Sequence, residues 1–313
     1  MGDASVHTER PQIVVVKLGG GLITTKEGAM AVRQAVLDRC AAEVLRAQRD
    51  TGCGMVIVHG AGSFGHHKAK VWRLAEGRWR GEGSPPGPDR DAAIQSQADA
   101  VTEVRNDMLN LSVAVARSFE EQFRGTHTRG AVQTARFPPH RWARGTGMTF
   151  EGSVDPLLSM ALSTAQGKEG ALVEIPITWG DVTSVDGPLG FGVLSGDDIV
   201  FRLAAGCPPD ATVRVVFAIS GADGVLRVPP EEATAEDLIE KWSDEQSFVG
   251  RHRHHHDVTG GIGLKVARAI AIAAASVDVT IVNGEVDGRL YAAVVGSQVR
   301  GTAFLGKRNR PSD

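Results

Sequence analysis

The stretch from Met55 to His66 places the strongest constraint on the fold of this chain. It reads Met-Val-Ile-Val-His-Gly-Ala-Gly-Ser-Phe-Gly-His, and its four leading apolar residues predict a short buried strand. Gly60, Gly62 and Gly65 let backbone amides approach an anion closely, which residues with a Cβ would prevent. His66 follows the last of these glycines and can donate a hydrogen bond to the anion or exchange a proton with it. The stretch therefore predicts a strand that ends in an anion-binding turn.

The same glycine spacing also fits two other interpretations. It matches G-x-G-x-x-G, the fingerprint of dinucleotide-binding turns, and it suits an ordinary tight turn between a strand and a helix. A dinucleotide fold places an acidic residue about 20 positions further on, at the end of the next strand. Glu82 stands near that distance, but inside the Gly/Pro-rich stretch 81–88, so the dinucleotide interpretation is disfavoured. The chain also lacks G-x-x-x-x-G-K-[ST] and is therefore not a P-loop kinase.

Composition limits the class of protein. The 313 residues suffice for one large or two modest domains with a real core. A net charge of −3 and an aromatic content of only 5% argue against a nucleic-acid partner. Cys40, Cys53 and Cys207 are odd in number and far apart, which indicates reduced thiols of a cytoplasmic protein. Residues 1–10 do not resemble a signal peptide, and no run approaches the ~18 apolar residues that a spanning helix needs, so we expect no membrane association.

Apolar strands alternate with helical patterns along the chain, which predicts an α/β fold with parallel strands and crossover helices. Strands are predicted at residues 12–17, 55–58, 172–178, 213–219 and, as the last strand, 277–282. Helices are predicted at about 29–49, 94–123, 155–166 with Asp155 as N-cap, from 197, and 266–275. The segment 179–198 reads as a hairpin leading into a helix, and the arginine-rich segment 126–152 as a loop. The apolar stripe of the 94–123 helix, which includes Val104 and Met108, predicts core packing.

Glycines stand beside charged or hydroxyl residues at the ends of at least four predicted strands. In an open α/β sheet such ends meet in one crevice at the carboxyl edge. The set comprises Lys17 with Gly19, Gly20 and Gly21; the turn from Gly60 to His66; Gly180 with Asp181; Ser195, Gly196 and Asp197; Ser220 with Asp223; and Gly260 and Gly261 with Lys265. Phosphate cradles combined with cations and carboxylates suit phosphoryl transfer, whose transition state spreads negative charge over the transferred oxygens. Lysines and Mg²⁺ would supply positive charge, and carboxylates would hold the metal or orient the lysines.

In this order along the chain, the motifs resemble the amino-acid-kinase superfamily and, within it, the isopentenyl phosphate kinases. The matching pieces are Lys17-Leu18-Gly19-Gly20-Gly21, His59 to His66, Trp179-Gly180-Asp181, Ser195-Gly196-Asp197-Asp198, Ala222-Asp223-Gly224-Val225 and Asp257-Val258-Thr259-Gly260-Gly261. The resemblance implies an α/β fold, a three-layer α/β/α sandwich with a mainly parallel central sheet. It implies a single kinase domain over 11–306, with an acceptor-binding half at about 11–206 and a nucleotide-binding half at about 207–306. Residues 1–10 and 307–313 are expected to be disordered tails.

The resemblance also implies a reaction. The γ-phosphate of ATP, with Mg²⁺ as the accompanying ion, would pass to isopentenyl phosphate and form isopentenyl diphosphate and ADP, in a homodimer. His66 would bind the acceptor phosphate, and Lys17 would stabilise the transferred phosphoryl group with Lys26 near it. Asp197 would orient the lysines. Acceptor contacts are expected at Ala61, Gly62, His66, Gly180, Asp181, Ser195 and Gly196. Nucleotide contacts are expected at Lys17, Gly19, Gly20, Gly21, Gly62, Ser220, Asp223, Gly261 and Lys265. No particular residue is assigned as a metal ligand, although Asp181 and Ser195 stand where metal- or substrate-side contacts are expected.

Three positions depart from the family pattern. Gly21 stands where a serine is usual, Trp179 where a histidine precedes the Gly-Asp pair, and Gly221 where an acidic residue is usual. The cluster from His252 to His256 could read as a metal-binding tract, but a histidine-rich exposed loop is the commoner case.

Two alternative functions stay open from the sequence. One is a kinase of another small phosphate or phosphonate, in the manner of fosfomycin kinase, because His66 would serve any tetrahedral anion. The other is a non-catalytic nucleotide-binding regulator on the same fold. The joint presence of Lys17, His66, Asp197 and Lys265 argues against the regulator. The acceptor chain length and the role of segment 126–147 stay open as well.

Overall fold

The computed structural model describes residues 10–25, 30–81, 86–87, 96–124, 131–167, 171–243 and 261–307. The strands are β1 (Gln12–Leu18), β2 (Gly54–His59), β3 (Val132–Arg136), β4 (Val173–Trp179), β5 (Asp181–Val185), β6 (Gly190–Leu194), β7 (Thr212–Ile219), β8 (Asp278–Asn283) and β9 (Gly301–Phe304). The helices are α1 (Gly20–Ile23), α2 (Gln34–Thr51), α3 (Gly62–Val71), α4 (Gln97–Arg124), α5 (Asp155–Ala165), α6 (Gly196–Ala205), α7 (Gly261–Ala274) and α8 (Arg289–Val295). Among these residues, no helix is both long and apolar enough to cross a membrane.

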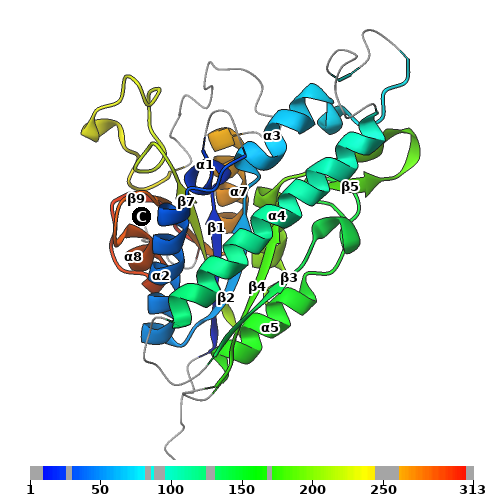
Figure 1. Ribbon diagram of the computed structural model, residues 1–313. Helices are drawn as coiled ribbons and strands as arrows, with labels where there is room; N and C mark the ends of the chain where they lie inside the picture. The colour runs from blue at the N-terminus through cyan, green and yellow to red at the C-terminus, as the bar shows by residue number, and fades with distance from the viewer. Residues whose placement is uncertain are drawn as a thin grey trace, which may run out of the picture.

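One central sheet joins the early and late parts of the chain (Figure 1). Its seven strands lie in the order β3-β4-β2-β1-β7-β8-β9, and β5 and β6 form a separate hairpin. β1 pairs in parallel with β2 and with β7, so that Val15 lies between Val56 and Val215. β9 alone runs antiparallel to its neighbour β8. The prediction of a mainly parallel α/β sheet is confirmed, and its strands all end at the same edge as β1, apart from β9.

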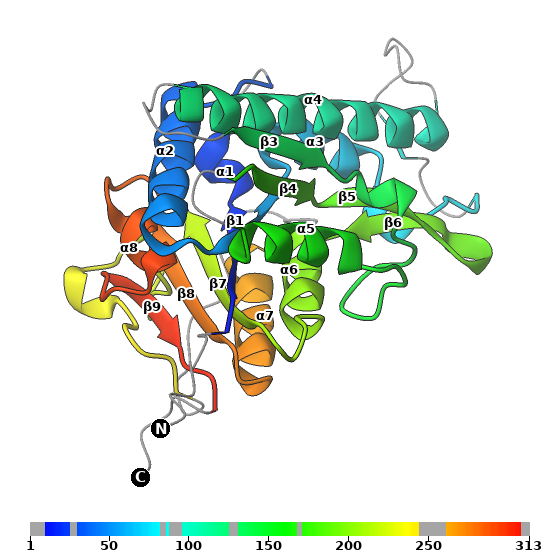
Figure 2. The same ribbon diagram turned by 90° about the horizontal axis from the view of Figure 1, so that it is seen from below.

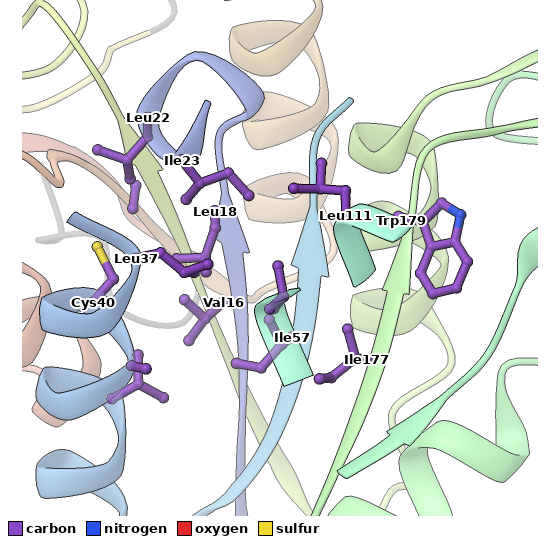
Figure 3. Close-up of a cluster of buried hydrophobic side chains, with 14 of the residues drawn as sticks. Val16, Leu18, Leu22, Ile23, Leu37, Cys40, Ile57, Leu111, Ile177 and Trp179 are labelled. Atoms are coloured by element: carbon purple, nitrogen blue, oxygen red, sulfur yellow. The ribbon is translucent and has the colours of Figure 1, made fainter. Parts of the chain in front are cut away.

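The sheet is buried on both faces by helices, which makes three layers (Figure 2). Because side chains alternate along a strand, Val14 and Val16 of β1 face one core, and Ile13 and Val15 face the other. The first core is completed by residues of α2, α4 and α8, and the second by residues of α5, α6 and α7. Figure 3 shows part of the first core, where Val16 lies near Leu37 of α2. The apolar runs in β1, β2 and β7 are therefore explained by burial on two faces.

Two strands were not predicted from the sequence. β3 lies inside the segment interpreted as a loop, at one edge of the sheet, and its residues Val132–Arg136 are only partly buried or exposed. An edge strand of this composition has no apolar run to reveal it. At the other edge, 277–282 is not the last strand, because α8 and the four-residue β9 follow it.

Two predicted helix starts were wrong by about five residues, and one predicted N-cap was wrong by one. α2 begins at Gln34 instead of about 29, because Val32 forms a β-bridge with Thr24. α7 begins at Gly261, five residues before the predicted start, since its first turn contains glycines that hide the helical pattern. In α5, Val154 is the N-cap and Asp155 is already helical.

Candidate active site

A cavity of about 560 Å³ lies at the carboxyl ends of the central strands. It is lined by the residues that follow β1, β2, β4 and β7, and α1, α3 and α7 gather around these strand ends (Figure 1). Ala61, Gly196 and Gly261, which line the cavity, stand at the starts of α3, α6 and α7. The first N–H groups of a helix have no intrahelical acceptor and carry partial positive charge. Three helix starts in one cavity wall therefore favour an anionic ligand.

Two lysines share one buried carboxylate in this cavity. Lys17 at the end of β1 is 5% exposed and donates a hydrogen bond to Oδ1 of Asp197, which is 2% exposed. The Nζ of Lys265 in α7 lies 3.3 Å from Oδ2 of the same carboxylate. Burial lowers the pKa of the Lys17 ammonium to about 8, although Asp197 opposes that shift. Burial alone would raise the pKa of Asp197, but the two lysines lower it, so the carboxylate stays ionised. With two cations and one anion, the cluster carries net positive charge.

The glycine turns after β1 and β2 are interlocked. A Cβ at Gly20 would lie 2.2 Å from the Gly62 nitrogen, and a Cβ at Gly60 would lie 2.5 Å from the Gly20 nitrogen. Gly62 has a φ of +50° and approaches Thr24, whose hydroxyl donates to the Gly20 carbonyl and accepts from the Ser63 amide at 3.0 Å. These glycines are required by the close contact of two backbones as well as by any phosphate.

His66 lines the cavity from the second turn of α3, beside an apolar end. A Cβ at the preceding residue, Gly65, would lie 3.2 Å from the Met108 sulfur. The apolar lining of this end comes from α3, α4 and the β5–β6 hairpin, namely Ala69, Val104, Met108, Val182 and Val193. Because apolar surface is favourably buried against apolar ligand atoms, this end suits a short hydrocarbon attached to an anion that reaches His66.

The opposite part of the cavity wall combines backbone turns with apolar side chains. Ser220 and Gly221 follow β7 and lie in the wall with Gly261 and Lys265. Beyond them the lining residues are Ile219, Val225, Leu226, Val228, Pro230, Glu231 and Ile262. Backbone turns next to mainly apolar lining suit a ligand that combines phosphate groups with an apolar ring.

Most residues predicted for the site line this one cavity. They are Lys17, Gly19, Gly20, Gly21, Ala61, His66, Gly180, Asp181, Ser195, Gly196, Asp197, Ser220, Gly261 and Lys265. Gly62 and Asp223 are absent from the lining. Gly62 packs against Gly20 instead, and Asp223 pairs with Arg289 and with Arg300 Nε, the latter at 2.6 Å. Lys26, Gly260 and the cluster from His252 to His256 lie outside the described residues.

Asp181 lines the cavity, yet its carboxylate oxygens make hydrogen bonds within the protein. Oδ1 accepts from the Val182 amide at 2.8 Å. Oδ2 accepts from the His140 amide and lies 2.7 Å from His140 Nδ1. The side chain is 0% exposed. In this structure Asp181 therefore holds the segment around His140 against β5. No pattern in the sequence indicated His140 as the partner of Asp181.

The three departures from the family pattern have local explanations. A Cβ at Gly21 would lie 3.3 Å from the Ser220 hydroxyl, so a hydroxyl already stands near that position. Trp179 is fully buried and stacks on His59 with ring centroids 5.3 Å apart. Burial lowers the pKa of His59 to about 4, so this ring is neutral and structural. Gly221 has a φ of +77°, a conformation that a residue with a side chain rarely adopts.

The chain belongs to the amino acid kinase family, whose model matches residues 12–283. Isopentenyl phosphate kinases of other organisms align with most of the chain. That of Methanothermobacter thermautotrophicus is 28% identical and aligns with 94% of this chain and 100% of its own length. That of Haloferax volcanii is 32% identical over 84% of this chain and 89% of its own length. The chain is therefore an enzyme of the isopentenyl-phosphate-kinase-like type.

Solved structures of isopentenyl phosphate kinases share the fold. One is 22% identical with a TM-score of 0.67 over 93% of this chain and 99% of the other. A product complex from T. acidophilum is 24% identical with a TM-score of 0.64, again over 93% of this chain and 99% of the other. The three-layer α/β/α sandwich expected from the sequence is confirmed by this likeness.

Proposed function

We propose that the protein transfers the γ-phosphate of ATP to isopentenyl phosphate, giving isopentenyl diphosphate and ADP. The observation that carries this proposal is a single cavity holding both the Lys17–Asp197–Lys265 cluster and His66 beside an apolar end. The site would need two anion-binding groups if the acceptor already carries a phosphate. His66 would donate to the acceptor phosphate, and the net positive cluster would stabilise the transferred phosphoryl group. The relatives named above support the same substrate.

The chemistry assigned to these residues is positioning and charge stabilisation. An oxygen of the acceptor phosphate attacks the γ-phosphorus, the bond to the β–γ bridging oxygen breaks, and ADP leaves with that electron pair. Lys17 and Lys265 would stabilise the charge on the transferred group, and Asp197 would hold both ammonium groups in place. His66 would hold the acceptor phosphate by a charge-assisted hydrogen bond.

We further infer that residues up to about 206 form the acceptor-binding half, apart from the glycine turn after β1, which contacts the nucleotide phosphates. Later residues form the nucleotide-binding half. The described part of the chain contains no group of three or more potential metal ligands. Mg²⁺ would be held mainly by phosphate oxygens and water, as is usual for this ion, and would neutralise phosphate charge. The family resemblance supports a homodimer and a cytoplasmic enzyme.

A phosphonate such as fosfomycin is the second candidate acceptor, because His66 would also bind that anion. The apolar end of the cavity favours an acceptor with a hydrocarbon tail over a small polar one. Its lining residues are Ala69, Val104, Met108, Val182 and Val193. A purely regulatory role is disfavoured, because a regulator has no need to keep a second lysine on a buried carboxylate.

The test is ADP release from ATP with isopentenyl phosphate, with fosfomycin, and with no acceptor. We expect turnover with isopentenyl phosphate to exceed both other rates by at least about tenfold, since the apolar tail contributes binding energy that the others lack. Equal rates in all three reactions would contradict the proposed acceptor, and a higher rate with fosfomycin would favour the second candidate.

Replacing Met108 by alanine should broaden the acceptor range toward longer tails. Met108 is fully buried on α4 and lines the apolar end, so the shorter side chain leaves space there. We expect kcat/KM for a monophosphate with a ten-carbon prenyl tail to rise about tenfold relative to that for isopentenyl phosphate. The ratio is measured with both acceptors at saturating ATP.

Met55→Ala is the matched control for this experiment. Met55 is also fully buried, but it lies on β2 outside the cavity lining. Both changes should lower the free energy of unfolding by about 2–5 kcal/mol. A similar change of acceptor preference in both variants would mean that general loosening, not the space at Met108, is responsible.

A further inference from the structure

The loop after β7 is tied to a carboxylate that lies far away in the sequence. The amide of Gly221 donates to Oε2 of Glu285 at 2.9 Å, and the Glu285 backbone is fixed by a hydrogen bond from its own amide to Asn283 Oδ1. Gly221 lines the cavity in the part we assign to the nucleotide, whereas Glu285 is absent from the lining. The position where the family usually has an acidic side chain therefore carries a glycine whose amide binds a carboxylate from the turn after β8.

The other oxygen of Glu285 reaches the first glycine turn through an arginine. Glu285 Oε1 lies 2.6 Å from Arg33 Nη1, and the same nitrogen donates to the Leu22 carbonyl at 3.2 Å. Leu22 belongs to α1 and, like Gly21, lines the cavity. One carboxylate thus connects two cavity walls, the α1 turn after β1 and the loop after β7.

The same loop has two further ties to the C-terminal part of the chain. Asp223 pairs with Arg289 of α8 and with Arg300, and the Val225 amide donates to the Thr302 hydroxyl of β9 at 2.8 Å. These ties hold the loop to the outer strands. Among these three ties, only the one through Glu285 also reaches α1, by way of Arg33 and the Leu22 carbonyl.

We propose that Glu285 is a positioning residue for the phosphates of the nucleotide. It acts on the loop after β7 through the Gly221 amide, and on α1 through Arg33, the N-cap of α2, which donates to the Leu22 carbonyl. This inference rests on the proposed assignment of that cavity part to ATP. A loop binds phosphate well only when its backbone is held in place before the ligand arrives, because ordering the loop on binding weakens affinity. Removing Glu285 releases the Gly221 amide and the Arg33 guanidinium at once, so the loop after β7 and α1 lose this shared tie beyond the β1–β7 strand pairing.

The experiment compares Glu285→Ala with Glu43→Ala in the full chain. Glu43 is a matched control: its carboxylate accepts from the amides of Gly288 and Tyr291 and pairs with Arg39 at 3.1 Å, but it touches neither α1 nor the loop after β7. The dissociation constant of ATP is measured by calorimetry without acceptor. The KM of each substrate is measured by ADP release.

We expect Glu285→Ala to raise the dissociation constant and the KM of ATP about tenfold, the size of one lost charge-assisted hydrogen bond, with the KM of isopentenyl phosphate changed less than about twofold. Glu285→Gln keeps an acceptor for Gly221 but loses the charge facing Arg33, so it should recover about half of the lost binding free energy. Glu43→Ala should lower the unfolding temperature and leave the ATP constants within about twofold, since it removes only a tie between α2 and the start of α8.

An equal rise of the ATP constants in Glu285→Ala and Glu43→Ala would overturn the inference, and so would a parallel rise of both substrate KM values. Calorimetry keeps this outcome separate from the proposed function. Wild-type protein that binds ATP but phosphorylates no acceptor would contradict the function while the comparison of Glu285 with Glu43 still stands.

Discussion

Lys17→Met is expected to lower kcat by about 10²–10³, the usual effect of removing one preorganised group that stabilises transition-state charge. The lysine is buried at the end of β1 and donates to Asp197, so its ammonium is fixed before substrates arrive. The affinity for ATP should fall much less than kcat, because the charge on the transferred group is largest in the transition state. Asp197 keeps Lys265 as a partner at 3.3 Å, so the variant does not leave a buried carboxylate without a cation.

The measurement is steady-state ADP formation at saturating substrates, with calorimetric ATP binding and a thermal unfolding curve as checks on the fold. Lys68→Met is the control, since Lys68 also pairs with a largely buried aspartate, Asp107, and does not line the cavity. That variant should keep kcat within about threefold. A folded Lys17→Met protein with wild-type kcat would refute the role assigned to Lys17.

The pH profile provides a second readout of the same residue. Because burial lowers the pKa of Lys17 to about 8, the free enzyme loses this cation as the pH rises through about 8. We therefore expect wild-type kcat/KM for ATP to decline above about pH 8, since this ratio reports groups of the free enzyme. Lys17→Arg keeps its charge at every accessible pH, so any activity that it retains should lack this decline.

The sequence predicted the cavity better than it predicted the edges of the sheet. Lys17, Asp197 and Lys265 are separated by up to 248 positions, yet each lies at the end of a strand or in the first two turns of a helix, and parallel topology brings such positions to one edge. β3 and β9 were missed because an edge strand needs at most one apolar face. In β3, the polar residues Gln133, Thr134 and Arg136 hide the alternation that would reveal it, and β9 has only four residues. Hydrophobic periodicity shows which side chains are buried, but it does not show which strands pair with one another.

Other site features could not be predicted because they depend on contacts between distant side chains. Met108 was recognised as a core residue of the long helix and is one, but the same apolar stripe also lines the cavity. Asp223 and Asp181 were predicted from their motifs to contact ligands. The structure adds partners that the motifs do not indicate, namely Arg289 and Arg300 for Asp223 and His140 for Asp181. A carboxylate in a turn looks the same in a sequence whether it faces a ligand or an arginine.

Replacing His66 by alanine should lower kcat/KM for isopentenyl phosphate by about 10- to 150-fold, the range for a lost hydrogen bond to a charged group. His66 lines the cavity beside Gly65 and the Met108 sulfur, where the acceptor phosphate would join its apolar tail. ATP binding should stay within about twofold in calorimetry, because the nucleotide contacts lie on other turns.

His67→Ala is the control for this prediction, since His67 is the next residue of α3 but its side chain is exposed and outside the cavity lining. It should keep both substrate constants within about twofold. His66→Gln retains an N–H donor and should recover part of the lost activity, which loss of helix packing alone would not allow. If His66→Ala weakened ATP and acceptor binding equally, or if His67→Ala did as much damage, His66 would not be the acceptor-phosphate ligand. The cavity would then need another donor, and the helix start at Ala61 is the nearest one in the chain that lines it.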